Sequence, residues 1–237
     1  MLSIHINTEY SYISPYSVMI LLSFIAGLLA QFVLNIKRGV EKRFTIYLTA
    51  LSLLLSMELG LALTYVTSKG QTFGLSSIGG LAGMYVAVFI IGAISRDRYG
   101  TKTMLDNCTL ILPLMYSVSK VGCLLGGCCY GRPYHGPCCI EYTRHGVVSD
   151  GVFPVQLAET VVFFVIFVIG ITMARKHKKS TIFWVFMSSA TAKLLLDFLR
   201  DSHVNCVITL NQILCLLLML IAAVVSIVKK CRKQQLN

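Results

Sequence analysis

The sequence at the end of an apolar stretch near mid-chain reads Lys120-Val121-Gly122-Cys123-Leu124-Leu125-Gly126-Gly127-Cys128-Cys129-Tyr130-Gly131. It places an ammonium group and three thiols at membrane depth. Because hydrocarbon penalises charge, a lysine there needs a partner and is a candidate for a functional site. Nearby glycines let the backbone approach a ligand, and cysteines offer nucleophiles, metal ligands or redox centres. This stretch therefore predicts a chemical site within a membrane helix.

The composition indicates an integral membrane protein. Hydrophobic residues make up 56% of the 237 residues and charged residues only 13%, whereas a soluble domain carries roughly a quarter charged residues. Seven apolar stretches approach the roughly 20 residues that a spanning helix needs. They lie near residues 16–36, 44–66, 74–95, 105–127, 154–174, 181–199 and 208–228. We expect an all-α membrane protein with seven transmembrane helices, in a single domain over residues 1–237.

The basic residues predict the orientation of these helices. Fifteen lysines and arginines follow the first, third, fifth and seventh spans, and only four lie in the opposite connections. Positively charged loops stay in the cytosol, so the N-terminus is expected outside and the C-terminus in the cytosol of a bacterial plasma membrane. Because each basic cluster flanks a span, the net charge of +11 indicates topology and contact with anionic headgroups rather than nucleic-acid binding.

Several polar residues lie inside or at the ends of the predicted spans. Lys193 and Asp197 are four residues apart and share one helical face. With the orientation above, the outer half of the membrane holds Lys120, Glu159, Lys193, Asp197, Arg200 and Gln212. Such groups, and Glu58 in the second span, are expected to face the bundle interior or a wet cavity. Together with a long, folded outer loop over residues 131–153, they predict a polar cavity open to the outer leaflet.

Five segments, in order and on the expected spans, resemble those of one enzyme family. Residues 78–83 match its His-Gly-Gly-Leu-x-Gly segment, and residues 119–131 match its signature Gly-Arg-x-Gly-Asn-Phe-x-Asn-x-Glu-x-x-Gly. Residues 153–159 match His-Pro-x-Gln-Leu-Tyr-Glu, residues 193–200 match Arg-x-x-x-Glu-Phe-x-Arg, and residues 211–214 match Gly-Gln-Ile-Leu. Over most of its length, from about Tyr16 to the seventh span, the chain resembles the prolipoprotein diacylglyceryl transferase family.

The resemblance implies a seven-span enzyme that moves diacylglyceryl from phosphatidylglycerol onto the lipobox cysteine of a prolipoprotein, without a cofactor. Its partners would be an anionic phospholipid and a prolipoprotein or another thiol acceptor. Lys120, Lys193 and Arg200 would bind phosphate, while Glu159, Asp197 and Gln212 would orient the cations and the substrate. The remaining residues expected to bind substrate are Tyr16, Gly79, Gly80, Gly122, Gly131 and Gln156.

The chain departs from the family pattern where chemistry would be carried out. Ile78 stands in place of the family's essential histidine, and isoleucine cannot act as a base. The signature arginine is Lys120, and the arginine of the sixth span is Lys193. Lysine keeps the positive charge but loses the two-pronged fork of arginine. The family's asparagine and glutamate in the signature are Cys123 and Cys128. These departures indicate a divergent, cysteine-rich member that lacks the usual general base.

A cysteine could fill this gap. Lys120 precedes Cys123 by three residues, and a nearby ammonium favours the nucleophilic thiolate. Cys123 and Cys128 are therefore candidates for covalent catalysis, beside Lys120, Lys193 and Asp197. The alternative for Cys123 is a small buried apolar residue. Two rival functions stay open: a membrane thiol-disulfide oxidoreductase on the same fold, and a non-catalytic lipid-binding accessory protein.

Four cysteines fall at or beyond the outer end of the fourth span, as the pairs Cys128-Cys129 and Cys138-Cys139. In an oxidising compartment we expect at least one disulfide between the two pairs. A metal site that also uses His135 is the alternative, but adjacent cysteines rarely chelate one ion well. We therefore expect no metal. His135 and His145 are expected on the surface of the loop.

Overall fold

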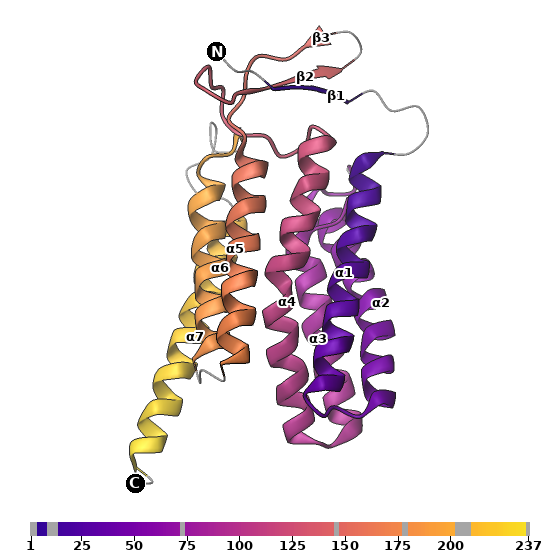
Figure 1. Cartoon of the computed structure of the whole chain (residues 1–237), viewed down its shortest axis with the longest axis vertical. Helices are drawn as coiled ribbons and strands as arrows, with labels where there is room; N and C mark the ends of the chain where they lie inside the picture. The colour runs from indigo at the N-terminus through magenta and orange to yellow at the C-terminus, as the bar shows by residue number, and fades with distance from the viewer. Residues whose placement is uncertain are drawn as a thin grey trace. The chain divides into compact units, whose positions relative to one another are not determined.

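A computed structural model describes residues 4–8, 14–71, 74–144, 147–176, 180–201 and 210–235 of the chain. Over these ranges it is mostly helical (Figure 1). The helices are α1 Pro15–Lys37, α2 Lys42–Thr67, α3 Ser77–Ser95, α4 Arg98–Leu125, α5 Val155–Arg175, α6 Thr181–Asp197 and α7 Leu210–Gln235. Three short strands complete the described elements: β1 Ile4–Asn7, β2 Ile140–Arg144 and β3 Val147–Val148.

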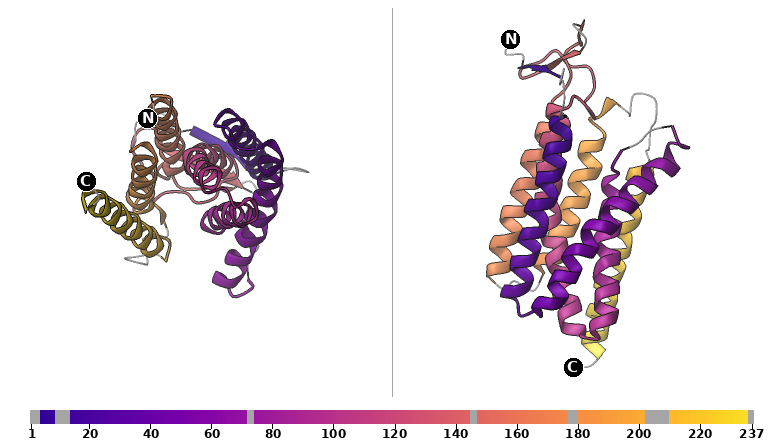
Figure 2. Two further views of the ribbon diagram at one scale, coloured as in Figure 1. Left: turned by 90° about the horizontal axis from the view of Figure 1, so that it is seen from below. Right: turned by 90° about the vertical axis from the view of Figure 1, so that its right-hand side faces the viewer.

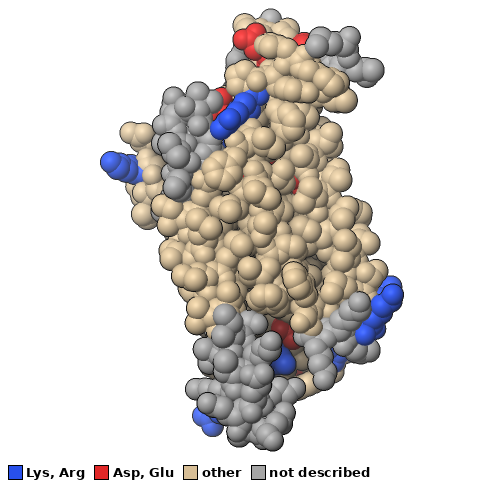
Figure 3. Space-filling model, turned by 90° about the vertical axis from the view of Figure 1, so that its left-hand side faces the viewer, with Lys and Arg blue, Asp and Glu red and all other residues tan. Residues whose placement is uncertain are grey.

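The helices have the length and surface of membrane spans. Within the described residues, the five helices α1 to α5 are long and apolar enough to cross a membrane. Many of their apolar side chains point outward, as lipid-facing side chains do, including Leu29, Phe89 and Val161. On the face drawn in Figure 3, few charged side chains lie between the ends of the helices. These features confirm a helical membrane protein, and each predicted span coincides with a helix. The number of crossings stays a prediction, because α6 has 17 residues and α7 offers only the shorter apolar segment Gln212–Val224.

The chain divides into two compact units. One unit comprises Val18–Ser119, and the other comprises Met1–Ser17 with Lys120–Asn237. Helix α1 begins, and helix α4 ends, in the second of these. We call them the N-terminal helical unit and the site unit, and describe each by itself.

In the N-terminal helical unit, α2 and α3 pack closely through glycines. A Cβ atom added at Gly79 would collide with the backbone carbonyl of Leu59, and one added at Gly83 would collide with that of Leu55. Only glycine permits such an approach, which is how small residues drive helix association in membranes. The apolar core beside this contact includes Leu48, Met84, Val88 and Ile111.

In the site unit, helices α5 and α6 lie side by side (Figures 1 and 2). The connection from α4 to α5 folds into a small sheet, in which β2 pairs parallel with β1 and antiparallel with β3. Ile140 and Val152 also exchange two backbone hydrogen bonds, at 3.0 and 2.9 Å. The connection is therefore folded, as expected, but its strands were not predicted. The expectation of a purely helical chain missed this sheet.

Candidate active site: a buried ion network beside three thiols

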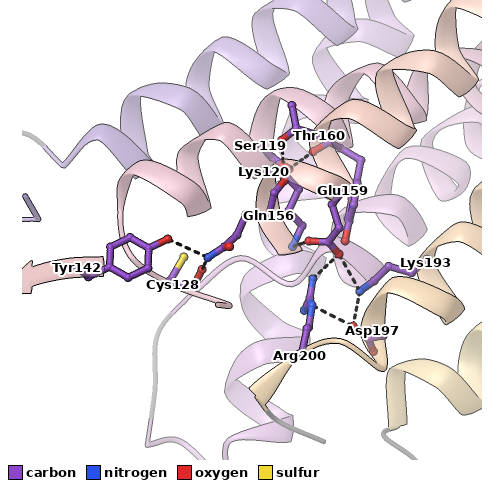
Figure 4. A network of polar contacts seen from close by, with 11 residues as sticks. Ser119, Lys120, Cys128, Tyr142, Gln156, Glu159, Thr160, Lys193, Asp197 and Arg200 are labelled. Atoms are coloured by element: carbon purple, nitrogen blue, oxygen red, sulfur yellow. Dashed lines mark hydrogen bonds and ion pairs between the residues drawn. The ribbon is translucent and has the colours of Figure 1, made fainter. Parts of the chain in front are cut away.

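Glu159, in the second turn of α5, is the centre of a buried network of charges (Figure 4). Its side chain is fully buried, with 0% exposure. Its Oε2 atom lies 3.1 Å from Lys120 Nζ. Its Oε1 atom lies 2.6 Å from Arg200 Nη2 and 3.7 Å from Lys193 Nζ. One carboxylate from α5 thus joins a cation at the end of α4 to two cations from α6 and the residues after it.

Asp197 completes the network. Its Oδ1 atom lies 2.7 Å from Lys193 Nζ and 3.1 Å from Arg200 Nε. The network therefore holds three cations and two carboxylates, which leaves one formal positive charge among five side chains. Buried charges are expensive, and a buried ion network seldom adds stability over apolar packing of the same volume. Three cations gathered around one buried carboxylate point to a function, because they could also pair with an anionic ligand.

Local structure explains how these side chains meet. Lys193, Asp197 and Arg200 are spaced by four and three residues, so α6 and the turn after it present them on one face. The backbone of Arg200 is held by an antiparallel bridge to Gly131. Next to it, Arg132 N–H donates to Leu199 O at 3.0 Å. A Cβ added at Gly131 would lie 2.5 Å from the Phe153 carbonyl oxygen. Gly131 therefore allows the close chain crossing that positions Arg200.

The end of α4 folds three thiols together. Gly127 has φ +62°, the left-handed conformation that commonly terminates helices. Cys128 N–H donates to Cys123 O at 3.1 Å, which closes the six-residue turn typical of such an end. As a result, the Sγ atoms of Cys123, Cys128 and Cys129 all lie within 4.8 Å of one another. We call these three residues the thiol cluster. Cys123 is buried, with 7% exposure, Cys128 is half-buried and Cys129 is exposed.

Neighbouring polar groups support the thiol cluster. The fully buried Gln156 donates from Nε2 to the Cys128 carbonyl at 2.9 Å and to Tyr142 Oη at 3.2 Å (Figure 4). Burial raises the pKa of Tyr142 to about 12, so its hydroxyl stays protonated. Hydrogen bonds with the Cys123 and Cys128 thiols, together with nearby cations, lower the pKa of Cys129 below its usual range. The same cluster raises the pKa of Cys128. It therefore favours a thiolate at its exposed end.

The expected disulfide between the two cysteine pairs is wrong for this structure. The seven cysteines whose side chains the structure describes are free thiols: Cys108, Cys123, Cys128, Cys129, Cys138, Cys139 and Cys215. The left-handed turn at Gly127 brings Cys128 back toward Cys123. Cys129 was not among the catalytic or substrate-binding residues expected from the sequence. A helix-ending Gly126-Gly127 before two cysteines was the signal that could have included it.

The family follows from a comparison with known proteins. The family model described as prolipoprotein diacylglyceryl transferase matches residues 4–228, which is nearly the whole chain. The chain belongs to the prolipoprotein diacylglyceryl transferase family.

Curated relatives agree with this assignment. A phosphatidylglycerol–prolipoprotein diacylglyceryl transferase of Dehalococcoides mccartyi strain 195 is 26% identical over 132 residues, covering 54% of this chain and 50% of the relative. The enzyme of the same name from Clostridium tetani is 23% identical over 167 residues, covering 68% and 66%. That of Dehalococcoides mccartyi strain BAV1 is 29% identical over 108 residues, covering 44% and 40%. The matches thus span between two fifths and two thirds of the relatives' lengths.

Most of the residues expected from the prolipoprotein diacylglyceryl transferase pattern lie in the site unit. The ion network contains Lys120, Glu159, Lys193, Asp197 and Arg200, and Gln212 of α7 is buried. Gly122 O accepts the Gly126 N–H at 2.8 Å in the last turn of α4. A Cβ on Gly126 would lie 3.1 Å from Tyr16 Cβ, so Tyr16 lies against the turn that leads into the thiol cluster.

Other expected residues lie elsewhere. Ile78, Gly79 and Gly80 belong to the N-terminal helical unit, where Gly79 packs against α2. A substrate-binding role for these glycines stays a prediction. Glu58 is exposed on α2, so it does not lie in a packed interior, and its expected place in a wet cavity stays a prediction. His135 is exposed on its loop, as expected, and His145 lies outside the described residues.

Proposed function

We propose that the protein is a plasma-membrane transferase that moves diacylglyceryl from phosphatidylglycerol, or a similar anionic phospholipid, to a cysteine thiol of a prolipoprotein. The observation that carries this proposal is the buried ion network, in which three cations converge on the carboxylate of Glu159. The curated relatives carry the same activity in their names. Neither the redox alternative nor the accessory-protein alternative is favoured by these relatives.

The network suits the departure of a phosphate group. In this transfer the bond between the diacylglyceryl carbon and a phosphate oxygen breaks, so negative charge grows on the leaving glycerol phosphate. Lys120, Lys193 and Arg200 converge on one buried carboxylate and carry more charge than the two acids neutralise. Cations held in place before the reaction stabilise such charge without reorganising. Glu159 and Asp197 act as positioning residues, since each holds two or more cations.

The membrane setting is also part of the proposal. All seven helices would cross the bilayer as one domain, with the N-terminus outside, the C-terminus in the cytosol and the ion network in a cavity open to the outer leaflet. The excess of lysine and arginine in the connections predicted to be cytosolic supports this orientation. Reporter fusions within residues 131–153 should report the outer side of the membrane. A cytosolic location for that loop would contradict the cavity.

The test is complementation of a bacterial strain depleted of its own diacylglyceryl transferase, scored by labelling lipoproteins with a fatty-acid probe. The wild-type chain should restore labelling. Lys193→Gln should abolish it, because the phosphate loses one of its cations. Lys102→Gln is the matched control, since Lys102 is exposed near the start of α4 and far along the helix from the network. A wild-type chain that labels no lipoprotein would contradict the proposal.

A further inference from the structure

The proposed transfer needs a group that removes the proton from the acceptor thiol. Glu159 and Asp197 are poor bases for this task, because each is paired with more than one cation. The two histidines that the structure describes in the site unit, His5 and His135, are both exposed. A thiol can also be deprotonated by coordination to a metal ion, without any side-chain base.

From the geometry of the thiol cluster we infer that Cys123, Cys128 and Cys129 bind one zinc ion as thiolates, with the fourth tetrahedral position open for the acceptor cysteine. The identity of the fourth ligand rests on the proposed function; the three-thiolate site does not. This inference departs from the expectation of no metal. The metal site weighed there combined Cys128-Cys129 with Cys138-Cys139 and His135, and did not include Cys123.

The spacing of the sulfur atoms fits a single ion. A Zn–S distance of about 2.3 Å in a tetrahedron places sulfur atoms about 3.8 Å apart. The three Sγ atoms already lie within 4.8 Å of one another, so shifts of about 1 Å suffice. Adjacent cysteines on an extended chain point to opposite sides. Here Gly127 and Cys129 both have positive φ, +62° and +57°, and the chain curls around the end of α4. The curl adds Cys123 as the third ligand.

The surroundings of the cluster suit an open catalytic site rather than a closed structural one. Catalytic zinc sites keep three protein ligands and leave one position for water or substrate. Cys123 is buried while Cys129 is exposed, so the cluster is accessible from one end. Gln156 donates a hydrogen bond to the Cys128 carbonyl and so holds this ligand in place, as neighbouring polar groups do around metal ligands. Lys120, one helical turn before Cys123, supplies positive charge beside a site that three thiolates would make anionic.

The chemistry balances without an oxidant or reductant. Binding of Zn²⁺ releases three protons from the cluster, and binding of the acceptor cysteine as a thiolate releases a fourth. The acceptor sulfur then attacks the diacylglyceryl carbon and forms the S–C bond. The C–O bond breaks, and its electron pair leaves with the glycerol phosphate toward the cations of the network. The resulting thioether is neutral, a weaker ligand than a thiolate, and it leaves the zinc.

Cobalt titration of the full-length, detergent-purified, reduced and chelator-stripped protein tests the site. Co²⁺ should bind at one ion per chain and give the charge-transfer absorption of cobalt–thiolate bonds. Cys129→Ser should weaken binding by at least about tenfold, since loss of even an outer-shell partner costs about 10–100-fold. Cys129 is exposed, so this variant should keep its fold. Cys138→Ser, also exposed, is the control and should bind like wild type. Absent charge transfer, or equal losses in both variants, would overturn the inference.

A peptide with a single cysteine tests the open position. It should change the cobalt spectrum, whereas the same peptide with serine should not; equal spectra would overturn the fourth-ligand role. Transfer measured after removal of zinc separates the two proposals. Full transfer by a zinc-free protein would reject the zinc role and leave the proposed function standing. Normal cobalt and peptide responses in a protein that transfers no lipid would reject the proposed function and retain the zinc site.

Discussion

The cores of the two units bury different polar groups. In the N-terminal helical unit these groups are neutral: Asn107 Nδ2 donates to Asn35 Oδ1 at 2.7 Å, and Ser23 Oγ donates to Met115 O at 2.6 Å. In the site unit, neutral groups such as Gln156 are also buried, but ionised side chains are buried beside them and gather around Glu159. Neutral polar contacts between helices are worth about 1 kcal/mol in membranes and serve packing. A buried ion network is costly to build, and among the described residues it occurs only in the site unit, which makes that unit the candidate place for ligand chemistry.

Glycines differ between the units in the same way. Gly79 and Gly83 bring two helices into backbone contact. Gly127 and Gly131 shape the site, because one ends α4 at the thiol cluster and the other admits the chain crossing at Arg200. A glycine of the family pattern is therefore not evidence of substrate contact until its neighbours are known.

Removal of the central carboxylate should have the largest effect. Glu159→Ala leaves three buried cations with Asp197 as the only acid of the network, and we expect a loss of stability of about 3–5 kcal/mol. Asn107→Ala, the matched change in the other core, leaves one amide unpaired and should cost about 1–3 kcal/mol. Unfolding of both variants in the same detergent measures the difference. Equal losses would break the contrast between ionised and neutral cores.

Loss of one cation should reduce transfer with a smaller effect on folding. Lys120→Gln should lower diacylglyceryl transfer and binding of phosphatidylglycerol vesicles, with transfer falling by about 10²–10³, the range for loss of one preorganised donor. Lys120→Arg should retain or improve both activities, because arginine offers phosphate a two-pronged contact. If wild type, Lys120→Gln and Lys120→Arg bound lipid equally, the network would have no role in phosphate binding.

The sequence predicted those features that depend on local physics. Apolar length located all seven helices, and spacing placed Lys193 and Asp197 on one face. The sequence did not predict which side chains pair across the fold, because no local pattern indicates that Lys120 and Arg200 both contact Glu159. The sheet was missed for the same reason: β1 pairs with β2, more than 130 residues away, and both strands are too short to show a pattern.

Alanine at two adjacent glycines separates packing from substrate contact. A Cβ at Gly79 meets the α2 backbone, which cannot yield, and we expect Gly79→Ala to cost about 1–3 kcal/mol through overpacking. At Gly80 the nearest atom is Ser56 O at 3.7 Å, an ordinary contact, so Gly80→Ala should stay within about 0.5 kcal/mol. Thermal unfolding and transfer assays report both effects. Normal stability with lost transfer in both variants would instead assign these glycines to the substrate.

An alanine at Gly127 should have a moderate effect on stability and a specific effect on the thiol cluster. An alanine in the left-handed region costs about 1–2 kcal/mol wherever it is placed. Gly39→Ala is the matched control, since Gly39 has φ +81° and a Cβ there would meet nothing within 4 Å. Gly127→Ala should lose more stability than Gly39→Ala, because a Cβ at Gly127 would lie 2.9 Å from Thr8 Cγ2. Only Gly127→Ala should change the rate at which iodoacetamide alkylates Cys129, because only this turn holds Cys129 beside the other two thiols. Identical alkylation rates in the two variants would mean that the thiol cluster does not depend on the turn that ends α4. The contrast between site-shaping and packing glycines would then not hold for Gly127.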